Sequence, residues 1–146
     1  MKTLIAFLLG FLSCAALAGL GSTPSSFGSG TPATTTAFGA GGGPIYTDQK
    51  RTLDSGTVVH EYVNAGGIVF AVSWSGPFMP DLDVLLGSYF QYLLAQSQKQ
   101  SRGDRSHIEV RRDDVVIYSG GRMGAFEGKA WLPALLPAGF KTSDVR

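Results

Sequence analysis

The sequence predicts an α+β fold, an antiparallel sheet of about five or six strands with one amphipathic helix packed across one face. Three observations support this prediction. Two runs rich in β-branched and aromatic residues flank an Asn/Gly turn, a helical stripe of leucines follows them, and further short β-rich runs come after the stripe. Strands, one helix and then more strands is the order expected of a sheet covered on one side.

The first predicted strands lie between residues 45 and 74. An extended segment at residues 45–53 precedes GTVVHEYV at 56–63, and a turn at 64–67 leads into IVFAVSW at 68–74. Two β-rich runs around an Asn/Gly turn predict an antiparallel hairpin. The larger side chains of the second run share one face and mark its core side: Ile68, Phe70, Val72 and Trp74. The first run leaves two core faces open, either Val58, His60 and Tyr62 or Val59, Glu61 and Val63.

The predicted helix follows the loop SGPFMPDL at residues 75–82. Asp81 is placed to cap it, because the carboxylate can accept unpaired amides of the first turn. An apolar stripe at helical spacing comes next: Leu82, Leu85, Leu86, Tyr89 and Leu93. We expect the helix to end at residues 101–103.

The last predicted strands lie in HIEVRRDDVVIYSGGRMGAFEGKAWL, residues 107–132. We expect three short strands, with turns near Arg112–Asp113 and at Gly120–Gly121, and a kink or turn at Glu127–Gly128 that divides the last strand. The tail LPALLPAGF is apolar but interrupted by prolines, so it is expected to pack on the core as an irregular cap.

Composition divides the chain into three segments. Residues 1–18 combine Lys2, an apolar core and Ala16-x-Ala18, which predicts a signal peptide cleaved after Ala18. The apolar core is shorter than the about 20 residues of a spanning helix, so no transmembrane segment is expected in the mature chain. Residues 19–43 carry no charge and are rich in Gly, Ser and Thr, which predicts a flexible linker, and residues 44–146 are expected to form a single domain.

Cys14 offers a second interpretation of the N-terminus. A cysteine behind an apolar run and a small residue is where bacterial lipoproteins are cut and acylated, and acylation would tether the protein to a membrane. Phe11 stands where such sites usually carry Leu, and the downstream Ala-x-Ala site competes. Cleavage after Ala18 removes the only cysteine, which leaves the mature chain without a thiol or disulfide.

Charge and residue content argue against several function classes. The chain carries 12 basic and 11 acidic residues, and loss of Lys2 makes the mature chain formally neutral. A neutral chain lacks the electrostatic footprint of a nucleic-acid-binding protein. The two histidines, His60 and His107, do not show the ligand spacing of a zinc site, so we expect no metal and no cofactor.

Candidate catalytic residues are few. His60 and Glu61 are adjacent, so on a strand they point to opposite faces and cannot form a dyad. An alternative function, a small envelope hydrolase, would need folding to bring together four residues that are separate in the sequence: Asp113, Asp114, His107 and Glu61.

Two long stretches resemble a known family. They are GTVVHEYVNAGGIVFAVSWSGPFMPDLDVLLGSYFQY at residues 56–92 and SGGRMGAFEGKAWLPALLPAGF at 119–140. The GP-x-x-PDL loop at 76–82 and the LP-x-x-x-P tail at 132–137 are the most distinctive pieces. The sequence is similar to the two-eight-four-four domain-of-unknown-function family over nearly all of residues 46–146. The resemblance implies a short exported protein of Gram-negative bacteria and supplies no catalytic residues.

The main prediction is a non-enzymatic binding or assembly module of the periplasm or cell surface, with an envelope or cell-surface protein as its partner. Export, a small domain and an excess of aromatic residues support it. We expect the contact zone in the loop before the helix, because loops on rigid scaffolds carry function. Its residues are Trp74, Pro77, Phe78, Pro80 and Asp81. A second alternative is a chaperone or a subunit of a secretion or surface-structure apparatus, which an exposed sheet edge would favour.

Overall fold

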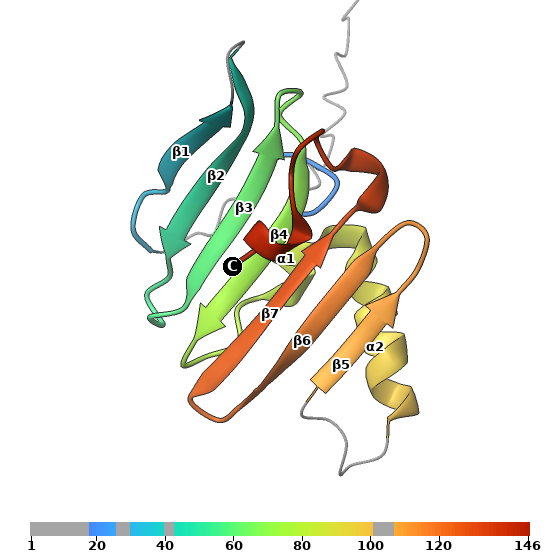
Figure 1. Ribbon diagram of the computed structural model, residues 1–146. Helices are drawn as coiled ribbons and strands as arrows, with labels where there is room; N and C mark the ends of the chain where they lie inside the picture. The colour runs from blue at the N-terminus through green and yellow to red at the C-terminus, as the bar shows by residue number, and fades with distance from the viewer. Residues whose placement is uncertain (1–17, 26–29, 40–42, 101–106) are drawn as a thin grey trace, which may run out of the picture.

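The computed structural model describes residues 18–25, 30–39, 43–100 and 107–146. The expected signal peptide, except for Ala18, and the lipidation candidate Cys14 lie outside the described residues. The described chain forms an antiparallel sheet of seven strands in the order β1-β2-β3-β4-β7-β6-β5, with a helical segment behind it (Figure 1). The antiparallel sheet with helix on one face is confirmed, but the sheet has seven strands rather than five or six. The strands are β1 (Thr34–Gly39), β2 (Pro44–Thr52), β3 (Val58–Asn64), β4 (Val69–Gly76), β5 (His107–Arg111), β6 (Val116–Arg122) and β7 (Ala125–Trp131).

The additional strand is β1, which lies in the segment expected to be a flexible linker. Thr34 is opposite Lys50 of β2 and Phe38 is opposite Tyr46, whose ring stacks on Phe38 at 5.0 Å. Consecutive threonines favour the extended backbone because they are β-branched. Composition alone conceals this strand, since its Thr and Ala residues also fit an uncharged linker.

Residues 18–25, the other described part of the expected linker, pack beneath the helical segment. The amide of Leu20 donates to Leu85 O at 3.0 Å, the amide of Gly21 donates to Val69 O at 2.8 Å, and Val69 N donates to Ser22 O at 2.9 Å. The Leu20 side chain is only 3% exposed. The expected boundary between linker and domain at residue 44 is therefore wrong for the described residues, because both described parts of 19–43 belong to the domain.

The helical segment begins as predicted. Asp81 caps α1 (Leu82–Leu86), and its carboxylate accepts the amides of Asp83 and Val84 at 3.1 and 3.3 Å. The helix is interrupted at Gly87, where φ is 54°, by a 3₁₀ turn before α2 (Phe90–Lys99). A positive φ suits glycine and breaks the helical hydrogen-bond ladder, so the one predicted helix is two short ones.

The sheet face under the helices is set by β3 and β4. Val59 and Val63 of β3 pack there, so the second of the two predicted faces is the one that faces the helices. In β4, Val72 and Trp74 also face the helices, whereas Phe70 packs on the opposite side with Tyr62. A register shift between Tyr62 and Val63 places Phe70 on that other side, since a bulge interrupts strict alternation. The prediction of one continuous face from residue 68 to 74 is therefore wrong.

The C-terminal segment covers part of the face opposite the helices (Figure 1). Phe140 and Val145 pack against Tyr62 and Phe70 in a second core cluster. The Tyr62 hydroxyl donates to Asp144 O at 3.2 Å and accepts the Arg146 amide at 3.2 Å. The tail is therefore the irregular cap that its prolines predict, and β3 and β4 are buried on both sides.

The hairpin of β6 and β7 differs from expectation. Gly120 and Gly121 lie inside β6, and the turn comes later, between Arg122 and Ala125. Gly128 lies inside a continuous β7, where an added Cβ would be 2.5 Å from Cε2 of Trp74. A glycine there leaves the space that the indole occupies.

Candidate functional site

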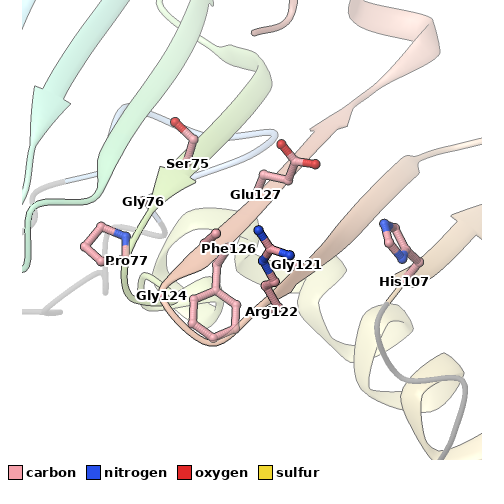
Figure 2. Close-up of a pocket in the computed structure, with 10 residues that line it drawn as sticks. Ser75, Gly76, Pro77, His107, Gly121, Arg122, Gly124, Phe126 and Glu127 are labelled. Carbon is pink, nitrogen blue, oxygen red and sulfur yellow. The ribbon is translucent and has the colours of Figure 1, made fainter.

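An open cleft of about 590 Å³ lies where β4 ends beside the turn between β6 and β7 (Figure 2). Antiparallel pairing builds it, because Gly76 at the end of β4 is opposite Phe126 near the start of β7. The lining residues are Ser75, Gly76, Pro77, His107, Gly121, Arg122, Gly124, Ala125, Phe126 and Glu127.

Glycines keep the strands of this cleft close together. An added Cβ at Gly76 would lie 2.5 Å from the Cα of Thr57, and one at Gly121 would lie 2.7 Å from the Cα of Phe126. No other residue fits at either position without moving the backbone. Two of the residues that line the cleft are therefore glycines because neighbouring backbone leaves no room for a side chain.

The rim of the cleft is polar on the side of β6 and β7. Arg122 and Glu127 come from neighbouring strands and both line the cleft, while His107 stands apart at the start of β5 (Figure 2). All three side chains are exposed. A cation and an anion on one rim can bind polar groups of either sign.

A second hollow of about 280 Å³ adjoins the cleft and shares Ser75, His107 and Glu127 with it. It runs past Lys129 to Arg146 at the C-terminus. The two hollows together form a shallow groove that crosses β4, β7 and β6.

Apolar side chains flank the cleft at the end of the sheet. Phe78 and Met79 in the loop between β4 and α1 are 61% and 41% exposed, and Met123 in the turn between β6 and β7 is 94% exposed. Pro77 and Phe126 are in the same two regions of the chain and line the cleft itself. We call these five residues the apolar end.

Thr57 holds the exposed loop in place. Its buried hydroxyl donates to Phe78 O at 2.6 Å and lies 3.4 Å from the Phe78 amide. The loop is therefore fixed to the start of β3, and the Phe78 ring is presented to solvent from a rigid support.

The five residues predicted as a contact zone have different positions and roles in the structure. Pro77 and Phe78 lie at the surface beside the cleft. Trp74 fills the core, Pro80 is buried, and Asp81 caps α1. The surface of this loop is thus formed by Pro77 and Phe78, together with Met79, which the sequence analysis passed over.

The four residues of the hydrolase alternative lie apart. Glu61 is buried on β3 and accepts the Ser25 amide at 2.9 Å, and burial raises the pKa of its carboxyl above the usual range. His107 begins β5, whereas Asp113 and Asp114 follow its other end in an exposed turn. Strands β4, β7 and β6 separate β3 from β5.

One pair of titratable side chains escaped sequence reasoning. His60 Nδ1 lies 2.9 Å from Oδ1 of Asp48, in a half-buried contact between β3 and β2. Asp48 is opposite Tyr62 in the sheet register, two pairs along the strands from His60, so only the register reveals that the two side chains share a face. The pair lies outside the cleft and links the side chains of β2 and β3.

Two further properties concern ions and membranes. Within the described ranges, no three His, Cys, Asp or Glu side chains gather closely enough to hold a metal ion. No helix among the same residues has both the length and the apolar character needed to cross a bilayer.

The residues missed at the cleft share one cause. Arg122, Phe126 and Glu127 lie in a hairpin whose turn was expected at Gly120–Gly121. Only the correct turn brings Phe126 opposite Gly76 and Glu127 opposite Ser75, with Arg122 at the end of the same hairpin. The signal available in the sequence was the second glycine-containing turn, Met123–Gly124.

Comparison with known proteins gives one match. No curated protein and no solved structure matches the chain. The model of the family described as protein of unknown function (DUF2844) matches residues 16–145, which confirms the resemblance seen in the sequence. The match includes residues 18–25 and β1, in agreement with their place in the fold. The chain belongs to the DUF2844 family of proteins of unknown function.

Proposed function

We propose that this protein is an exported, non-enzymatic binding or assembly module of the periplasm or cell surface, and that the apolar end is its contact surface. The observation that carries the proposal is the exposure of Phe78, Met79 and Met123 in the two loops whose neighbouring residues, Pro77 and Gly124, line an open cleft. Exposed apolar side chains around a cleft are typical of protein contact sites.

The surroundings of the apolar end suit a protein partner. Binding sites on proteins commonly combine an apolar centre with a polar rim, and Arg122 and Glu127 supply such a rim here. Methionine side chains adapt to a partner's shape, because they are unbranched and polarizable. An envelope or cell-surface protein is the partner that fits an exported module.

Export is part of the proposal, and the packing of residues 19–25 is compatible with cleavage of the signal peptide after Ala18. Cleavage after Ala18 would leave intact the residues from Gly19 to Ser25, which pack beneath α1. If Cys14 were acylated instead, at most about 14 Å of extended chain would join the lipid to the packed Ala18. Mass spectrometry of the mature N-terminus distinguishes a free Gly19 from an acylated Cys14.

A specific observation favours a second candidate, a subunit of a secretion or surface-structure apparatus. Strand β1 ends the sheet and exposes all six of its residues. Such an edge can receive a strand from another chain. By contrast, the separation of Glu61 from His107, Asp113 and Asp114 offers no geometry for the hydrolase alternative.

Site-specific photocrosslinking in the producing cell tests the contact surface. A photoreactive residue replaces Phe78 or Met123 in two variants and Leu94 or Leu135 in two controls, which are also exposed apolar positions but lie outside the apolar end. We expect one defined crosslinked partner from positions 78 and 123, and its loss when Phe78→Ser is added to the variant at position 123. Equal crosslinking at all four positions, or none at 78 and 123, would refute the proposal.

A further inference from the structure

The two edges of the sheet are not equivalent. At one edge, β5 carries Glu109 and Arg111, which are paired with each other, and Gln100 after α2 donates to His107 O at 3.2 Å. At the other edge, β1 reads TTTAFG, carries no charge and exposes every residue. Charges and covering side chains discourage strand addition, so within the described chain β1 is the edge open to it.

Strand β1 is also held in shape before any partner arrives. The Thr31 amide donates to Thr52 O at 2.9 Å, and the Thr31 hydroxyl donates to the same oxygen at 3.2 Å. At the other end of the strand, Phe38 stacks on Tyr46 with the ring planes 13° apart. A strand fixed at both ends loses little conformational entropy when another strand pairs with it.

We propose that the occupant of this edge is β1 of a second copy of the chain, paired antiparallel so that one sheet continues through both copies. Opposite residues of an antiparallel pair point to the same face, and Thr34, Thr36 and Phe38 share a face of β1. A two-fold axis at Thr36 satisfies this condition. It places Thr36 opposite Thr36, Thr34 opposite Phe38 and Thr35 opposite Ala37.

The side chains at this junction favour self-pairing. Threonine opposite threonine, and an aromatic ring opposite a β-branched residue, are favourable cross-strand pairs. The nearest charged strand is β2, with Asp48, Lys50 and Arg51. Copies of β2 would lie about 14 Å apart, three strand spacings, which exceeds the screening length of about 8 Å at physiological salt. Like charges therefore do not oppose the pairing.

This association uses the edge of the sheet farthest from β5 and does not involve the apolar end. The dimer and the proposed contact surface can therefore be tested separately, and failure of one leaves the other intact. Pairing through one strand of six residues buries less area than the roughly 1,200–2,000 Å² of a stable interface. We therefore expect a reversible dimer that is seen at high protein concentration.

Sedimentation velocity of the full chain, as processed by the producing cell, measures the association. Thr36→Lys places two like charges opposite each other at the axis, and we expect it to raise the dimer dissociation constant on the order of tenfold. Gln98→Lys makes the same charge change at an exposed position of α2, remote from β1, and should leave the constant unchanged. A protein that is monomeric at all concentrations, or a dimer unaffected by Thr36→Lys, overturns the proposal.

Oxidative crosslinking in a Cys14→Ala background tests the register. Thr36→Cys places two thiols opposite each other, within about 5.5 Å between Cβ atoms, where a disulfide can form. Thr35→Cys is the matched control, because residue 35 is opposite Ala37 and its two copies lie farther apart. We expect a disulfide-linked dimer at least several times faster from Thr36→Cys. Equal rates from the two variants would exclude this register and with it the proposed pairing.

Discussion

Leu20→Ala tests whether residues 18–25 are part of the folded domain. The Leu20 side chain is 3% exposed and belongs to the main core cluster with Leu85 and Val69. The substitution removes three carbon atoms, which at about 0.8 kcal/mol for each buried methylene is about 2.4 kcal/mol, and the remaining cavity adds to this. We expect a loss of about 3 kcal/mol in the free energy of unfolding.

Urea denaturation of the processed protein, followed by tryptophan fluorescence, measures this loss. The buried Trp74 reports unfolding of the core. Leu94→Ala is the matched control, because Leu94 is 46% exposed on α2 and alanine is a good helix former, so its loss should stay below about 1 kcal/mol. If the two substitutions cost the same, Leu20 does not pack in the core and residues 18–25 are the linker that their composition suggests.

Two further predictions concern the interior of the sheet. Gly128→Ala places a Cβ 2.5 Å from Cε2 of Trp74, so we expect a loss of about 2 kcal/mol in the free energy of unfolding, partly recovered by Trp74→Phe in the same chain. Strictly additive costs of these two substitutions would contradict the contact. Glu61→Gln removes a carboxyl whose pKa burial raises above 4.5 while retaining an acceptor for the Ser25 amide. The folded state holds that proton more tightly, so the wild-type free energy of unfolding should fall as pH rises from about 4.5 through the raised pKa. The free energy of unfolding of Glu61→Gln should fall less over the same range. Urea midpoints that change in parallel for the two proteins would contradict the raised pKa of Glu61.

Features that depend on neighbouring residues in the chain could be predicted from the sequence. The cap at Asp81 needs only a carboxylate before an apolar stripe, and the hairpin of β3 and β4 needs only two β-rich runs around a turn. Both are confirmed. The break at Gly87 was missed because the apolar stripe continues past it, from Leu86 to Tyr89, although the backbone there is no longer α-helical.

Features that depend on contacts between distant segments could not be predicted. Residues 18–25 contain few apolar side chains, but Leu20 fits beneath α1, and Ser25 supplies the amide that the buried Glu61 accepts. Neither contact leaves a periodic signal. The bulge that turns Phe70 away from Val72 is likewise set by pairing with β3, so strict alternation misplaces it.

The candidate site illustrates the same limit through its glycines. A glycine in a strand-like run has two interpretations, a turn or a position where another group must come close, and the sequence favours the first when two glycines are adjacent. Gly121 and Gly128 belong to the second kind, since neighbouring backbone and the Trp74 ring occupy the space that a Cβ would take. The structure has the turn at Met123–Gly124 rather than at the predicted Gly120–Gly121, and this difference changes which residues are neighbours. It extends β6 and β7 to the end of β4 and brings Phe126 opposite Gly76. It also leaves Met123, the most exposed large apolar side chain of the described residues, at the tip of the hairpin. The proposed contact surface therefore depends on a strand register, and a test that perturbs this hairpin tests the function and the fold together.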